Sequence, residues 1–93
     1  GNDPPANVLN TYAAVLVESG EPHLAWQQLE RGIGARAVDD ADRFVLGRIA
    51  EAYGLRDDAL RAYRQVKRPA TPGDIPTSWD FAQKRLKTLG VTP

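Results

Sequence analysis

Two glycines and two alanines recur along this chain at one common spacing. Gly20 stands 34 positions before Gly54, and Ala25 stands 34 positions before Ala59. Each glycine follows an apolar run at helical spacing, where a residue with positive φ can end a helix without strain. Each alanine comes five positions later, where a small side chain lets two helices approach closely. The recurrence predicts two copies of one unit, in which two helices are joined by a tight turn.

Apolar residues recur at three- and four-residue spacings in five stretches, which is the pattern of helices with one buried face. The predicted helices cover residues 7–19, 22–34, 40–53, 57–68 and 77–89. Asp40 or Asp42 is expected to cap the third helix, and Thr77 or Ser78 the last. No stretch alternates as a strand does. We therefore expect an all-α fold of about five helices, built from antiparallel helix–turn–helix repeats that stack as an α-solenoid.

Composition narrows the classes of function. The chain has 93 residues, which suits one domain, and with no cysteine and one histidine a disulfide or a typical zinc site is excluded. Twelve basic and twelve acidic residues cancel, so the chain lacks the overall field that attracts nucleic acid or anionic lipid. Residues 1–39 carry a net charge of −3 and residues 40–93 carry +3. This asymmetry is either ordinary surface charge or a means of orienting a partner. No window of about 20 apolar residues predicts a transmembrane helix.

No group of residues predicts catalysis. Asp57 and Asp58 are adjacent, so on a helix they point about 100° apart, and their place in a first helical turn indicates interaction with the helix dipole. His23 also falls in a first turn, without the nucleophile and acid that a catalytic histidine needs. Arg61, Arg64 and Arg68 share one predicted helical face, which is either solvated or able to bind an acidic partner. We expect a protein that is not an enzyme and takes no cofactor or metal.

The repeat resembles the tetratricopeptide repeat, whose 34-residue units consist of two helices. The family has a leucine and a small residue in the first helix, a turn glycine, and an alanine and an aromatic residue in the second helix. The second unit matches at Leu46-Gly47, Gly54, Ala59 and Tyr63. The first unit has Tyr12-Ala13, Gly20, Ala25 and Leu29 in these places. Leu9 and Arg43 stand where the family usually has tryptophan. Another α-hairpin array and an unrelated helical bundle are the alternatives.

The resemblance implies a division of the chain into repeats. Residues 1–5 are expected to be a disordered tail, 6–39 and 40–73 the two repeats, and 74–93 a loop followed by a helix. That helix is either a cap or the first helix of a partial third repeat. Phe81-Ala82 would then take the place of Leu46-Gly47 after one additional loop residue.

In the family, ligands lie in the concave groove lined by the first helix of each repeat. Carried over to this chain, the partner-binding residues are expected to be Asn10, Thr11, Phe44, Arg48, Glu51, Trp79 and Gln83. Phe44 and Trp79 would anchor an extended peptide, and Arg48 and Gln83 would hydrogen-bond to it. The alternative is that both rings pack between repeats. The lysine and asparagine clamp that holds chaperone tails in some members is missing.

The resemblance thus implies a non-catalytic module that binds a protein or peptide in its groove, without nucleic acid or membrane insertion. The alternative is a stacking segment of a longer tetratricopeptide scaffold, with flanking repeats as its partners and no ligand of its own. The chain begins with Gly1 and contains no methionine, which indicates an excised or processed fragment. Nine arginines against three lysines hint at a bacterial source. A soluble protein is expected, with the cytoplasm favoured over the periplasm.

Overall fold

The computed structural model describes residues 6–35, 37–71 and 73–91, with the backbone alone for residues 6–10 and 35. The regular structure within these ranges is helical throughout: α1 (Ala6–Glu18), α2 (Pro22–Ala35), α3 (Asp40–Ala52), α4 (Arg56–Arg64) and α5 (Ser78–Thr88). The prediction of an all-α fold with about five helices is confirmed. The predicted tail at residues 1–5 lies outside the described residues.

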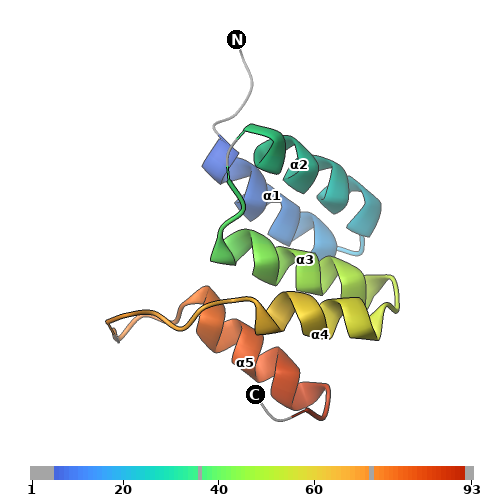
Figure 1. Ribbon diagram of the computed structural model, residues 1–93. Coiled ribbons are helices and arrows are strands. Elements are labelled where there is room, and N and C mark those ends of the chain that lie inside the picture. The colour runs from blue at the N-terminus through green and yellow to red at the C-terminus, as the bar shows by residue number, and fades with distance from the viewer. Residues whose placement is uncertain (1–5, 36, 72, 92–93) are drawn as a thin grey trace.

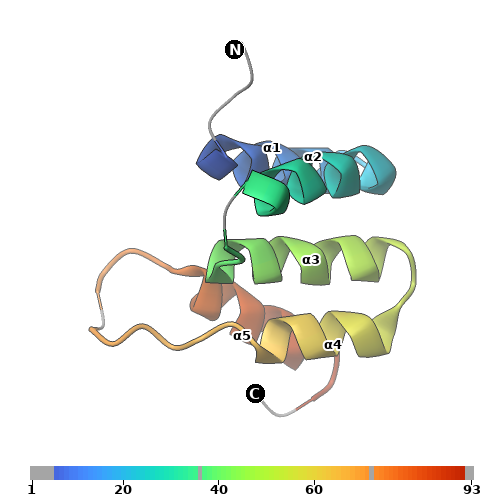
Figure 2. The ribbon, with the colours of Figure 1, turned by 45° about the horizontal axis from the view of Figure 1, so that its top comes forward.

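The helices form two antiparallel pairs and one additional helix. Figure 1 shows α1 beside α2, then α3 beside α4, with α5 below them. α3 is the central element, because it contacts each of the other four helices, whereas α2 and α4 do not contact each other within the described residues. In Figure 2 the pair α1 and α2 forms one layer above α3, and α4 and α5 lie below α3.

The two pairs share one turn geometry. The amide of Glu21 donates to the carbonyl of Leu16 at 2.9 Å, and 34 positions later the amide of Leu55 donates to that of Ala50 at 2.8 Å. The glycine before each amide has a positive φ, +82° at Gly20 and +75° at Gly54. A Cβ at either position would meet nothing within 4 Å, so the backbone conformation, and not lack of space, requires glycine. The recurrence in the sequence is therefore a recurrence of structure at the turns.

α5 ends in the same turn, but its register differs from the expected one. Gly90 has a φ of +83°, and the amide of Val91 donates to the carbonyl of Leu86 at 3.1 Å. Gly90 follows Gly54 by 36 positions, so the long connection between α4 and α5 adds two residues and not one. The expected alignment of Phe81-Ala82 with Leu46-Gly47 is wrong by one residue, since Ala82 stands in the place of Leu46.

Two helix boundaries also differ from the predicted ones. Asp39, and neither Asp40 nor Asp42, caps α3: its carboxylate accepts from the amide of Asp42 at 2.9 Å, while the carboxylate of Asp42 accepts from the amide of Asp39 at 2.8 Å. This reciprocal capping box satisfies two amides at once. Thr77 caps α5, as expected. α4 ends at Arg64, before Pro69, so Arg68 does not share a helical face with Arg61 and Arg64.

The core consists of two clusters that meet at α3. In the first cluster, Val45 and Ile49 of α3 are buried against four residues of the first pair: Ala13, Val17, Ala25 and Leu29. The second cluster joins α3 and α4 to α5 through Ala50, Ala59, Leu60, Tyr63, Val66, Ala82 and Leu86. Gly47 makes the second pair possible, because a Cβ there would lie 2.6 Å from Cδ1 of Tyr63 and closer still to Cε1. No helix in the described ranges is long and apolar enough to cross a membrane.

Candidate functional site

A row of ionised side chains runs across α1, α3 and α5, where the partner groove was predicted. It begins at Glu18, the last residue of α1, passes through Arg48 and Glu51 of α3, and ends at Arg85 of α5. Of the predicted partner-binding residues, Arg48 and Glu51 are thus brought together. We call these four side chains the ionic row.

The contacts within the ionic row are close and well directed. Arg48 donates two hydrogen bonds to the carboxylate of Glu18, from Nε to Oε1 at 2.7 Å and from Nη2 to Oε2 at 3.0 Å. Its third contact, from Nη1 to Oε2 of Glu51, measures 3.1 Å. Arg85 binds the same carboxylate with Nε at 3.0 Å and also with Nη2. Paired donation from a guanidinium to a carboxylate is the strongest form of this contact, and here it links three helices.

Burial and charge act in opposite directions on Glu51. Its partial burial raises the pKa of the carboxyl, but hydrogen bonds from Arg85 and Tyr63 and the charges of both arginines outweigh that effect, so the pKa lies below its ordinary value. Hydrogen bonding from Arg48 likewise lowers the pKa of Glu18. The ionic row is therefore fully charged at neutral pH, and its members neutralise one another.

Tyr63 connects the ionic row to the core. This side chain is fully buried in the second cluster, and its hydroxyl donates to Oε2 of Glu51. Burial, together with that hydrogen bond, raises the pKa of the phenol. The aromatic residue expected at this position of the repeat therefore packs its ring on Gly47 and satisfies a carboxylate at the surface.

An aromatic pair lies beside the ionic row, but it is not the predicted pair. The ring of Phe44 lies 5.9 Å from that of Phe81 and 5.8 Å from that of Tyr63, both in tilted contact. Phe81 remains 45% exposed, and Phe44 is half-buried. Sequence reasoning missed Phe81 because the connection before α5 was given the wrong length. It also missed Arg85, whose partner Glu51 lies 34 residues away along the chain.

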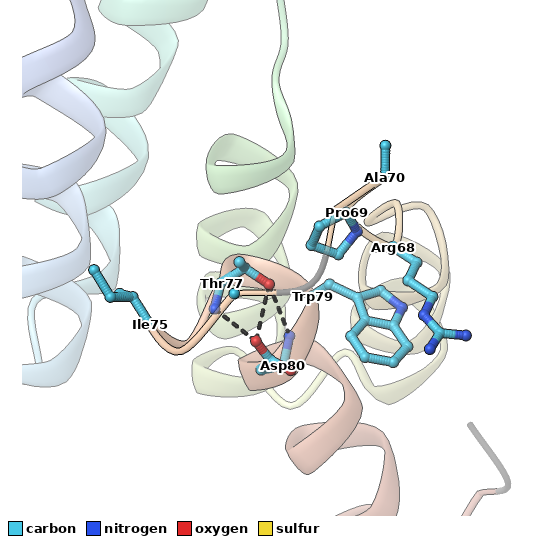
Figure 3. A pocket seen from close by; sticks show the side chains of 8 residues that line it. Arg68, Pro69, Ala70, Ile75, Thr77, Trp79 and Asp80 are labelled. Atoms are coloured by element: carbon cyan, nitrogen blue, oxygen red, sulfur yellow. Dashed lines mark hydrogen bonds between the residues drawn. The ribbon is translucent and has the colours of Figure 1, made fainter.

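The predicted anchor Trp79 packs elsewhere. Its half-buried ring covers the second core cluster, and the guanidinium carbon of Arg68 lies 5.3 Å from the ring centroid. Figure 3 shows the side chain of Arg68 next to this ring. Both residues line a hollow of about 490 Å³, together with Pro69 and Ile75. Thr77 and Asp80, at its base, bond to each other as the α5 capping box. Thr77 and Asp80 are therefore engaged in capping α5.

The remaining predicted residues belong neither to the ionic row nor to the Phe44–Phe81 pair. Gln83 is half-buried on α5, and Thr11 is exposed on α1. Asn10 belongs to α1, but its side chain lies outside the described part of the structure. The face formed by α1, α3 and α5 thus has the ionic row and the Phe44–Phe81 pair as its central features.

A second surface, not predicted from the sequence, lies between the two helix pairs. Trp26 of α2 faces Leu46 and Ile49 of α3 across an apolar cleft of about 440 Å³. Tyr53 and Leu55, each 50% exposed, form its wall at the α3–α4 turn. The cleft exists because α2 and α4 do not touch. The only sequence signal for it was Trp26, an aromatic residue outside the repeat pattern.

The described residues contain no group of three or more histidine, cysteine, aspartate or glutamate side chains placed to hold a metal ion. The two surfaces above offer apolar contact and paired charges. Comparison of the chain with protein families, with characterised proteins and with solved structures gives no significant match.

Proposed function

We propose that this chain is a non-catalytic, tetratricopeptide-like module that binds an extended peptide of a protein partner on the face formed by α1, α3 and α5. The observation that carries the proposal is the adjacency of the exposed Phe81 ring, in contact with Phe44, to the ionic row on a single face. An aromatic surface beside well-held charges supplies both an anchor and directional hydrogen bonds.

Support for the repeat family comes from the turns. The backbone hydrogen bonds around Gly20 recur around Gly54, 34 positions later, and α5 ends in the same way at Gly90. A small residue also lies at the contact between the two helices of each pair, Ala13 in the first and Gly47 in the second. These features favour two repeats, with α5 as the first helix of a third.

The ionic row defines what the peptide is expected to carry. Its members form ion pairs with one another, so each of the four charges already has a partner of opposite sign. Glu18 is the most open of the four, with 57% of its side chain exposed. A peptide is therefore expected to place an apolar residue on Phe81, and its basic groups toward the α1 end of the face. Charged contacts of this exposed kind steer and orient a partner more than they add affinity.

The test uses a phage-displayed library of random peptides, selected against the intact chain. We expect enriched peptides with an apolar residue near a basic one, and binding about tenfold weaker to the Phe81→Ala variant by fluorescence anisotropy. Tyr53→Ala is the matched control, because this ring is similarly exposed but lies at the cleft between the pairs. Failure to enrich any peptide, or an equal loss in both variants, would refute the proposed binding face.

The second candidate function is the stacking segment of a longer scaffold. The exposed apolar side chains Tyr12 and Val15 on α1 favour it, since they are 51% and 58% exposed. Under this alternative, peptide selection yields no ligand, and the apolar surface of α1 carries the interaction.

A further inference from the structure

The cleft between the two helix pairs combines a buried apolar lining with two aromatic rings. Its most buried lining residues are Ile49 and Ala50 of α3. Trp26 is contributed by α2, and Tyr53 and Leu55 by the α3–α4 turn. The volume of the cleft, about 440 Å³, lies within the range of small-molecule sites, which is about 300–1,000 Å³.

The packing of the core does not account for the three large side chains at this cleft. Trp26, Tyr53 and Leu55 are each at least 40% exposed, and neither core cluster of the described residues includes any of them. Isolated apolar side chains on a surface are ordinary, but here three of them, from both helix pairs, line one hollow. Apolar surface gathered in this way is typical of a ligand-binding groove.

The charge at the cleft favours a cation. Among the residues that line it in the described structure, Asp58 is the one charged residue. Oδ1 of Asp58 accepts from Nη1 of Arg61 at 3.1 Å, but both side chains are more than half exposed. An exposed ion pair of this kind is weak, so the carboxylate of Asp58 can still attract a ligand cation. Residues 1–39, which include α2, carry a net charge of −3, and their field has the same sign.

The lining also restricts the kind of cation. A primary ammonium group has three N–H donors, and each of them needs an acceptor when the group is bound. The side chains of the cleft provide acceptors only at the carboxylate of Asp58 and the hydroxyl of Tyr53. A quaternary ammonium group has no N–H to satisfy, and the faces of indole and phenol rings attract its charge. The cleft therefore matches a quaternary ammonium better than a primary one.

We propose that this cleft binds a small apolar molecule that carries a quaternary ammonium group. The apolar part of the ligand lies against Ile49 and Ala50, and the ammonium group lies at the rings of Trp26 and Tyr53, where Asp58 attracts it. The cleft shares no residue with the ionic row or with the aromatic pair beside it. This proposal and the proposed peptide-binding face therefore succeed or fail separately.

The test is an NMR titration of the intact chain at constant ionic strength. The probe is hexyltrimethylammonium, and hexanesulfonate, with the same alkyl chain and the opposite charge, is the control ligand. We expect saturable binding of the cation and at least about tenfold weaker binding of the anion, because like charges repel. The indole N–H signal of Trp26 is expected to shift with the cation. The indole signal of Trp79, which packs on the second core cluster, is expected to stay in place.

Two variants divide the site into charge and ring. Asp58→Asn keeps the size of the side chain and is expected to weaken binding of the cation about two- to fivefold, as for an exposed charge pair. Trp26→Leu keeps an apolar contact but removes the ring, and is expected to weaken binding about two- to fivefold. Because Trp26 is exposed and belongs to neither described core cluster, helical circular dichroism is expected to be unchanged.

Asp57→Asn is the matched control, since Asp57 is in the same first turn of α4 but does not line the cleft. It is expected to bind the cation as the parent does. Absence of saturable binding, or equal affinity for the cation and the anion, overturns the proposal. Unchanged affinity in Asp58→Asn or in Trp26→Leu overturns it as well. So do equal losses in Asp57→Asn and Asp58→Asn, because the overall charge of α4 would then be responsible.

Discussion

At the scale of single residues, Gly47 and Tyr63 are packed so closely that no side chain fits at residue 47. The ring of Tyr63 occupies the space that any side chain on residue 47 would need. The same ring is fully buried and its hydroxyl is bound to Glu51, so it has little freedom to move aside. Glycine is required at this position for space, whereas at Gly20 and Gly54 it is required for backbone conformation.

We predict that Gly47→Ala lowers the free energy of unfolding by about 1–3 kcal/mol, the usual cost of overpacking a filled core. Urea denaturation followed by circular dichroism measures it. Gly34→Ala is the control, because Gly34 is an exposed residue of α2 with nothing within 4 Å of an added Cβ. That substitution is expected to stabilise by up to about 1 kcal/mol, since alanine favours helix more than glycine does. Equal effects at the two positions would contradict the packing argument.

At the scale of helices, the ionic row and the caps define how the elements begin and how they are held together. Asp39 and Asp42 begin α3 by satisfying each other's amides. Near the opposite end of α3, Glu51 forms ion pairs with Arg48 of the same helix and with Arg85 of α5. Arg48 also forms an ion pair with Glu18 of α1. α3 is therefore joined to α1 and to α5 by charge as well as by apolar contact.

The ionic row predicts a definite dependence of stability on pH. The pKa values of Glu18 and Glu51 are lowered in the folded chain from an ordinary value of 4.5. Their contribution to stability is therefore complete above about pH 4.5 and is lost as the pH falls through the folded values. Glu51→Gln is expected to be less stable than the parent near neutral pH and to lose less stability between about pH 7 and pH 3.

Urea denaturation at both pH values measures this difference in slope. Glu30→Gln, at an exposed residue of α2, is the control and is expected to retain the pH dependence of the parent. If Glu51→Gln loses as much stability on acidification as the parent does, the carboxylate of Glu51 is not the group responsible.

At the scale of the whole molecule, the two core clusters divide the fold into a first pair and a unit of α4 and α5, which meet at α3. α5 contacts α3 and α4 and has no contact with α1 or α2 in the described structure. The layers in Figure 2 show the same division. A destabilising substitution in α5 is therefore expected to weaken the packing of the second cluster before that of the first.

The side chain of Leu86 is only 1% exposed, so Leu86→Ala would leave a cavity in the core. We predict that this substitution lowers the free energy of unfolding by about 2–5 kcal/mol. Phe81→Ala, on the same helix at 45% exposure, is expected to cost far less. Hydrogen exchange is expected to show faster exchange at α4 and α5 amides in Leu86→Ala, while α1 and α2 retain more protection. A uniform loss of protection over all helices would show instead that the two clusters unfold as one unit.

The local parts of this structure could be read from the sequence. The turn at Gly54 and the cap of α5 each depend on groups close by along the chain. The sequence alone indicated the turn correctly and narrowed the cap to Thr77 or Ser78, of which the structure has Thr77. The all-α class follows from the same local spacing. The cap of α3 was assigned to the wrong aspartate because three acidic residues stand within four positions, and only the backbone of Asp39 has the extended conformation that a cap needs.

The candidate site depended on packing between helices. Arg48 and Glu51 were expected to meet a partner, yet their nearest charges are Glu18 and Arg85, which lie 30 and 34 residues away along the chain. The length of the α4–α5 connection decided that Phe81, and not Trp79, meets Phe44. Val15 and Ile49 have the same local sequence setting, and only the presence or absence of a neighbouring helix pair separates an exposed valine from a buried isoleucine. Local bonding determined the helices and turns of this protein, whereas the pairing of distant side chains was decided by the tertiary structure, because it depends on distances between helices that no short stretch of chain determines.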